Sequence, residues 1–70
     1  MSAMVQVVVN GEPLDVASGL NVTKLLLQLG IVTGRVAIER NLNILPRAEW
    51  DQTTVSAGDR YEIVHLVGGG

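Results

Sequence analysis

The sequence predicts an α+β domain of two layers, in which one helix packs on one face of a mixed β-sheet. Three observations predict this class. A valine-rich strand pattern at residues 5–9 runs into Asn10-Gly11, the strongest short hairpin signal. One stretch with the helical period of 3.6 follows at residues 22–29, and strand patterns then return, ending in an alternating segment at residues 61–67.

The first pattern predicts a hairpin with arms at residues 5–9 and 13–16. The first arm is largely apolar on both faces, which is typical of a strand inside a sheet. The helical stretch then places its apolar residues on one stripe, at Val22, Leu25, Leu26 and Leu29. Asn21 is the expected N-cap, and Gly30 is the expected left-handed residue after the helix.

The second half of the chain predicts short elements separated by turn residues. In order, they are a strand at 36–40, a tight turn at 41–43, a strand at 44–45, one helical turn at 47–50 after Pro46, an edge segment at 54–55, a turn at 57–59 and a last strand at 61–67. Trp50 is expected to anchor the helical turn in the core, because so small a core gains most from its largest side chain.

This order of elements, with a helix on one face only, fits the β-grasp architecture. In that architecture the first and last strands pair in parallel at the sheet centre, which explains why both are apolar on both faces. We expect residues 1–67 to form a single β-grasp domain and residues 68–70 to form a flexible glycine tail.

Length and composition exclude several function classes. Seventy residues can hold a core but can rarely also enclose a substrate. The absence of cysteine excludes disulfides and cysteine-ligated metals, and one histidine cannot hold a metal alone. The five basic residues are scattered and the net charge is −2, so no nucleic-acid partner is expected. No apolar run approaches the roughly 20 residues of a membrane span, and no signal pattern is present, so we expect a cytoplasmic protein.

The tail is the most informative feature. Gly68, Gly69 and Gly70 directly follow a patterned strand, and residues without side chains add no burial. Such a segment can thread a narrow tunnel and present an unhindered carboxylate to a reactive group. A frayed end or an added linker would have the same composition, but the position directly after the strand favours a function.

Other polar residues receive structural interpretations. His65 lacks a serine or cysteine partner and is interpreted as a strand residue. No pair of carboxylates has the context of a general acid and base, and Asp59 is interpreted as shaping a turn. For Arg47, contact with a partner and capping of a carbonyl remain open.

These residues, taken together, resemble the thiamine-biosynthesis sulfur carrier (ThiS) family, most specifically over residues 37–70. The matching features are Asn10-Gly11 after a valine-rich strand, the helical residues 22–26, Ala37-Ile38-Glu39-Arg40-Asn41, Leu45-Pro46-Arg47 with Trp50, Gly58-Asp59 with Glu62-Ile63-Val64, and the closing Val67-Gly68-Gly69-Gly70. Each feature is weak alone, but their order and spacing are specific.

The resemblance implies a carrier and not an enzyme. An E1-like adenylating enzyme of the ThiF type would use MgATP to adenylate the carboxylate of Gly70, which would then become a thiocarboxylate. A relay protein fed by a cysteine desulfurase would supply the sulfur, and thiazole synthase of the ThiG type would receive it. Gly69 would fit the tunnel, and Val67 and Gly68 would form the hinge. No cofactor or metal would be bound by this chain, which also lacks a glycine-rich phosphate loop.

A carrier must serve several partners, so we expect a modest apolar patch near the tail, on the sheet face opposite the helix. Every second residue of the last strand is a candidate, beginning with Leu66 or Val67.

Three other functions stay open. A molybdopterin-synthase small subunit shares the fold and the terminal Gly-Gly, but usually has a longer chain and a proline before the tail, where this chain has Val64-His65-Leu66-Val67. A ubiquitin-like modifier would form covalent conjugates with lysines. A β-grasp binding module would not use its tail at all.

Overall fold

The computed structural model of the chain describes residues 3–31 and 35–66. Its elements in chain order are β1 (Met4–Val9), β2 (Glu12–Ala17), α1 (Val22–Gln28), β3 (Val36–Arg40), β4 (Asn43–Ile44), the 3₁₀ helix η1 (Arg47–Gln52) and β5 (Arg60–His65). Val67, Gly68, Gly69 and Gly70 lie outside the described residues.

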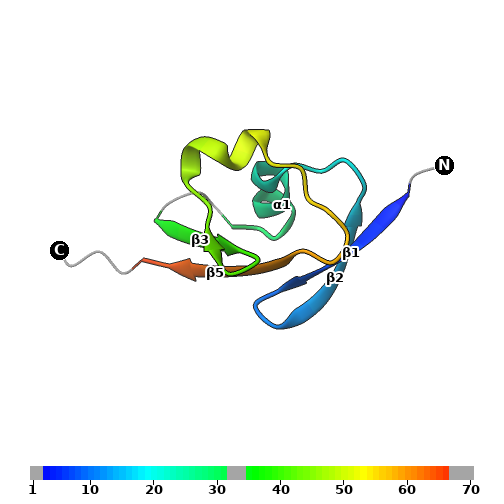
Figure 1. Ribbon diagram of the computed structural model, residues 1–70, viewed down its shortest axis with the longest axis horizontal. Coiled ribbons are helices and arrows are strands. Elements are labelled where there is room, and N and C mark those ends of the chain that lie inside the picture. Colours follow the sequence, from blue (N-terminus) through cyan, green and yellow to red (C-terminus); the bar gives the residue numbers. More distant parts are fainter. Residues whose placement is uncertain (1–2, 32–34, 67–70) are drawn as a thin grey trace.

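The five strands form one mixed sheet in the order β2-β1-β5-β3-β4. β1 and β5 pair in parallel, and the other neighbours pair antiparallel. α1 and η1 lie on the same side of this sheet (Figure 1). The predicted two-layer β-grasp fold is therefore confirmed, including the parallel pairing of the first and last strands.

Two left-handed turns set the register of the hairpins. Asn10 and Gly11 have φ values of 50° and 83°, so the predicted Asn-Gly turn joins β1 and β2 as a two-residue loop. A second such turn consists of Asn41 and Leu42, with φ values of 51° and 73°. Because this turn takes only two residues, β4 begins at Asn43, one residue earlier than predicted.

The helix follows its predicted signals. The Asn21 side chain accepts a hydrogen bond of 2.8 Å from the amide of Lys24, and Gly30 has a φ of 74°. The helix ends at Gln28 and spans 7 residues. A helix this short is not stable alone, so its buried stripe against the sheet stabilises it.

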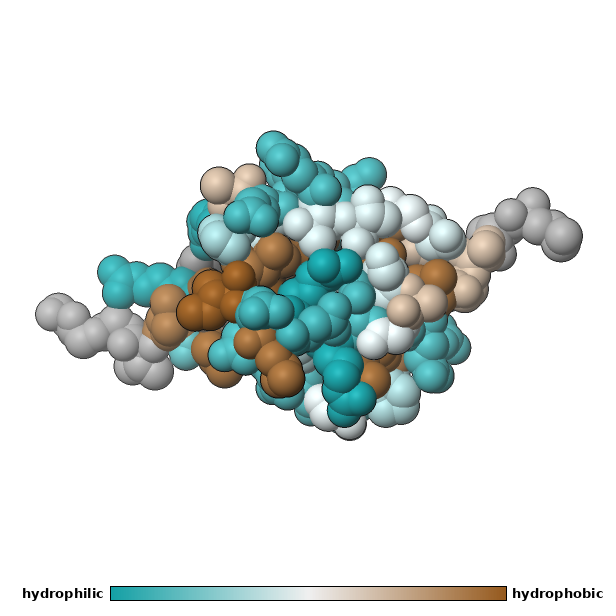
Figure 2. Space-filling view, in the orientation of Figure 1, coloured by the Kyte–Doolittle hydropathy of each residue, from teal (hydrophilic) through white to brown (hydrophobic). Residues whose placement is uncertain are grey.

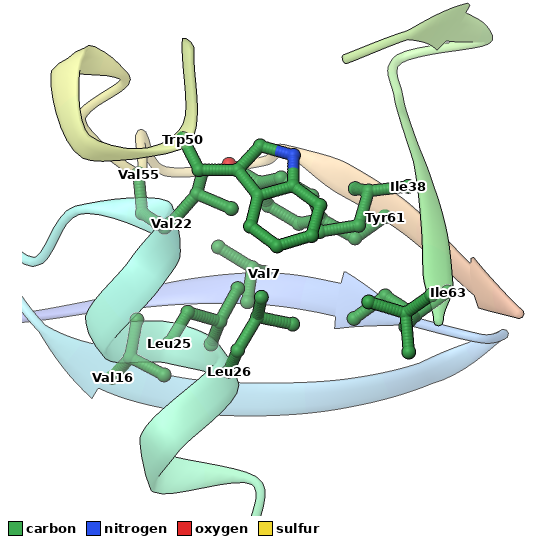
Figure 3. Packing of buried hydrophobic residues seen from close by; sticks show 11 residues of the cluster. Val7, Val16, Val22, Leu25, Leu26, Ile38, Trp50, Val55, Tyr61 and Ile63 are labelled. Atoms are coloured by element: carbon green, nitrogen blue, oxygen red, sulfur yellow. The ribbon is translucent and has the colours of Figure 1, made fainter. Parts of the chain in front are cut away.

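The core lies between the sheet and the two helices. Figure 3 shows its eleven buried apolar residues, contributed by both layers: Val7, Val16, Val22, Leu25, Leu26, Val36, Ile38, Trp50, Val55, Tyr61 and Ile63. Trp50 enters from η1, is only 4% exposed, and donates its indole N–H to the carbonyl of Leu45 at 3.0 Å. The guanidinium of Arg47 lies 5.0 Å from the centroid of the same ring. The prediction that Trp50 is a core anchor is confirmed.

Other predicted boundaries also differ from the structure, and the helical turn predicted at 47–50 extends to Gln52. The edge segment at 54–55 is reduced to a single bridge between Thr54 and Asn21, because Val55 turns into the core instead. The last strand begins at Arg60 and ends at His65. Tyr61 and Ile63 point into the core. His65 is the last residue of the strand and its side chain is exposed, which agrees with its interpretation as a strand residue.

Candidate functional site

The candidate site is the end of β5, from which the chain continues into the glycines. On one side β5 pairs with β3 as far as His65, and the Leu66 amide donates a 2.7 Å hydrogen bond to the carbonyl of Arg35. This pairing fixes the backbone of the strand through Leu66.

On its other side, β5 is held by an asparagine side chain. The backbone pairing of β1 with β5 reaches only Tyr61. Beyond it, Asn10 Oδ1 accepts a 2.7 Å hydrogen bond from the Ile63 amide, and Asn10 Nδ2 donates to the Ile63 carbonyl at 3.2 Å. The turn residue thus continues the sheet by two more hydrogen bonds. Sequence reasoning assigned Asn10 to the turn alone and missed this second role.

The two faces of β5 differ sharply. Tyr61 and Ile63 are buried beneath the helices, whereas Val64 and Leu66 are 53% and 54% exposed. Leu66, which was predicted to be a contact residue, therefore has a side chain that a partner can reach at the end of β5. Its predicted companions Val67, Gly68, Gly69 and Gly70 lie outside the described residues, and their roles stay predictions.

A buried carboxylate stabilises the start of β5, and the turn role predicted for it is only part of what it does. Asp59 Oδ2 accepts hydrogen bonds from the Ser56 amide at 2.9 Å, as the turn interpretation expects, and from the Tyr61 hydroxyl at 2.8 Å. It also forms an ion pair with Arg40 Nε at 3.1 Å, and Asp59 Oδ1 accepts from Asn41 Nδ2 at 3.2 Å. This Asp59 cluster joins the β3–β4 turn to β5.

Burial and hydrogen bonding act in opposite directions on Asp59. Burial raises the pKa of its carboxyl, but the hydrogen bonds that the carboxylate accepts, led by that of the Ser56 amide, bring the pKa below 3.8. Burial and the bond to Asp59 raise the pKa of the Tyr61 hydroxyl to about 12. Near neutral pH the Asp59 carboxyl is therefore ionised and the Tyr61 hydroxyl is protonated. The buried polar atoms of the Asp59 cluster all have hydrogen-bond partners within the protein.

The Asp59 cluster predicts loss of stability in acid. Because its pKa is lower in the folded than in the unfolded chain, Asp59 stabilises the fold fully above pH about 4, and this contribution is lost as the pH falls through the folded-state value. Asp59→Asn should lower the free energy of unfolding by about 1–3 kcal/mol at pH 7. The side-chain NH2 of the new asparagine would replace one carboxylate oxygen, and it would then face N–H and O–H groups that also donate. The substitution should also flatten the decline below pH 4. Urea unfolding of both proteins between pH 2 and pH 7 measures this, and parallel pH profiles would contradict it.

Metal sites and surface depressions are the other features of the described residues that bear on function. No group of three or more His, Cys, Asp or Glu side chains among them could hold a metal ion. A shallow depression beside the β1–β2 turn is lined by Val9, Asn10, Glu12, Pro13, Leu14 and Leu29, which include a single titratable group. Within residues 3–31 and 35–66, no helix is long and apolar enough to cross a membrane.

Comparisons with known proteins agree on one family. The ThiS family model matches residues 4–70. The chain is 32% identical over 65 residues to the sulfur carrier protein ThiS of Escherichia coli, covering 93% of this chain and 98% of that protein. The crystal structure of the thiamine biosynthesis protein ThiS from Geobacter metallireducens is similar with a TM-score of 0.82 and 40% identity, over 94% of this chain and 100% of that one.

Two longer proteins also match. The chain is 42% identical over 65 residues to a thiazole synthase of Paramagnetospirillum magneticum and 36% identical over 61 residues to one of Magnetococcus marinus. The matches cover 93% and 87% of this chain but only 20% and 19% of those proteins, so the chain spans about a fifth of their length.

Proposed function

This chain belongs to the ThiS family of sulfur carriers in thiamine biosynthesis, and from that membership we propose that it carries sulfur as a thiocarboxylate on Gly70. The observation that carries the proposal is the end of β5. The backbone is fixed through Leu66 by β3 and Asn10, and the glycines follow within two residues. A fixed strand followed by residues without side chains suits delivery of a carboxylate to another protein.

The proposed chemistry has two steps. A carboxylate oxygen of Gly70 attacks the α-phosphorus of MgATP, and pyrophosphate leaves, which gives an acyl-adenylate. Sulfide then attacks the carbonyl carbon and AMP leaves, which gives the thiocarboxylate. Where a persulfide attacks instead, an acyl disulfide forms, and a thiol then cleaves its S–S bond, which releases the thiocarboxylate and leaves a new disulfide. The chain has no cysteine, so it has no thiol on which to carry sulfur. It is in this proposal a co-substrate, and the ATP is bound by its partner.

The proposed partners act in turn, in the cytoplasm. An E1-like enzyme of the ThiF type adenylates Gly70, and a relay protein fed by a cysteine desulfurase delivers the sulfur. Thiazole synthase then receives it. The two thiazole synthases that contain a region similar to this chain support that last partnership, because a carrier and its acceptor gain effective concentration when they share one polypeptide.

Intact mass spectrometry tests the proposal. The chain is incubated with a ThiF-type enzyme, MgATP and inorganic sulfide, and its mass should rise by the exchange of one oxygen for one sulfur. Omission of ATP should prevent the change. An unchanged mass with an enzyme that is active on its own carrier would overturn the proposal.

Leu66 is proposed as a contact for the adenylating enzyme. Leu66→Lys should raise the KM for the carrier about tenfold, because a charge replaces apolar contact area at the partner's surface. The free energy of unfolding should change by less than about 0.5 kcal/mol, since the side chain is already half exposed. Leu27→Lys is the matched control, because Leu27 is 65% exposed on α1. An unchanged KM for Leu66→Lys in a folded protein would remove Leu66 from the interface.

A further inference from the structure

One face of the sheet is left open by the described elements, because α1 and η1 both lie on the other face (Figure 1). Apolar side chains stand on this open face along the second half of β5 and on β4, level with Glu62. Ile44 is 77% exposed, and Val64 and Leu66 are about equally half exposed. Figure 2 shows hydrophobic surface gathered toward the C-terminal end of the described chain, at the left of the view. We call Ile44, Val64 and Leu66 the outer patch.

Two carboxylates interrupt the outer patch. The strand register places Glu39 of β3 directly opposite Glu62 of β5, and Ile44 of β4 opposite Glu39 on its other side. Opposed residues share a face of the sheet, and so do residues two apart on one strand, so Val64 lies on the same face as Glu62. The acidic pair is therefore bordered by apolar side chains both across the sheet and along β5.

The acidic pair has no cation of its own in the described part of the chain. The ion pair found there joins Arg40 to Asp59. Arg60 stands on the same face two residues before Glu62, but the two side chains form no ion pair in the described structure. Like charges directly opposite on neighbouring strands destabilise a sheet. The isolated domain thus carries a repulsive pair that does not help it fold.

On the basis of the function and the Leu66 contact proposed above, we propose that Glu39 and Glu62 select the adenylating enzyme, which meets this acidic pair with an arginine or lysine set in an apolar surface. Covering the outer patch removes water from Glu39 and Glu62, which is costly unless a cation pairs with them. A guanidinium presents several N–H groups in one plane and can bind two carboxylates together.

The position of the face also points to this partner. β5 leads from the outer patch directly to the glycines, so an enzyme that draws Gly70 into its active site contacts this end of the strand. An apolar partner without a cation would leave two buried charges unpaired and be rejected. The acidic pair thus adds selectivity to an otherwise general apolar contact.

Steady-state kinetics of pyrophosphate release by the ThiF-type enzyme test this inference. The double variant Glu39→Gln/Glu62→Gln should raise the KM for the carrier about tenfold with kcat unchanged, because docking and not chemistry is weakened. The difference should shrink at about 1 M salt, where charge interactions are screened. The urea midpoint of the variant should stay equal or increase, since repulsion is relieved.

The matched control is Glu12→Gln/Glu49→Gln, which changes net charge equally at exposed positions on β2 and η1. Its KM should stay within about twofold of that of the unaltered chain, because these sites are outside the proposed contact. An unchanged KM for the first variant, or an equal rise in both, would overturn the inference while leaving the proposed function intact. No turnover of the unaltered chain would instead overturn the proposed function and the inference with it.

Discussion

Deletion of Gly69 and Gly70 should abolish sulfur loading completely. In the proposed function the partner holds the end of β5, so the position of the reacting carboxylate is set by the number of residues that follow. Removing two residues withdraws that carboxylate by about 7 Å of extended chain. Intact mass after incubation with the adenylating enzyme, MgATP and sulfide should show no exchange of oxygen for sulfur.

The truncated chain should fold and bind normally, because the core residues lie between Val7 and Ile63. It should therefore inhibit loading of the full chain competitively, with an inhibition constant near the KM. Gly69→Val retains the length but adds a β-branched side chain, and it should slow adenylation at least about tenfold if the tunnel admits only glycine. Sulfur gain by the truncated chain would contradict the assignment of Gly70.

Replacement of Trp50 by alanine should produce the largest loss of stability. Trp50 is almost fully buried between η1 and the sheet, and truncation of such a residue costs about 3–5 kcal/mol. A domain of 70 residues has a total free energy of unfolding of about 4–10 kcal/mol. Trp50→Ala should therefore be partly or largely unfolded at 37 °C, as urea unfolding followed by circular dichroism would show.

Trp50→Phe separates packing from hydrogen bonding. It retains an aromatic ring but removes the indole N–H that the Leu45 carbonyl accepts. We expect a smaller loss of about 1–3 kcal/mol from the unpaired carbonyl. A loss below about 1 kcal/mol for Trp50→Ala would mean that the core closes over the space, and the anchoring role would be wrong.

Local signals in the sequence predicted most of the elements. Asn10-Gly11 predicted a tight hairpin because asparagine and glycine adopt positive φ readily, and both residues do so in the structure. Asn21 and Gly30 likewise marked the two ends of the helix. Each of these signals depends only on residues within about four positions of one another, so a single sequence is enough to recognise it. The predicted start of β4 was wrong by one residue, because a turn can take two or three residues and the turn at Asn41-Leu42 takes two.

The contacts of the candidate site were less accessible to such reasoning. The Asn10 side chain binds Ile63, which is 53 residues away, and the Asp59 carboxylate collects donors from β3 and from the turn after it. The opposition of Glu39 and Glu62 likewise follows from the antiparallel register of β3 and β5. None of these pairs has a local spacing that marks it.

The sequence by itself determined the fold class, the hairpin, the helix with its caps, the core role of Trp50 and the family to which the chain belongs. These depend on backbone preferences, on hydrophobic period and on the order of short motifs, all of which are properties of the linear chain. Only the tertiary structure decided which polar groups meet across the sheet and which apolar side chains stay exposed beside β5. The reason is physical: strand register joins residues far apart in the chain, and a change of register by one residue would exchange the buried and exposed faces of the strand.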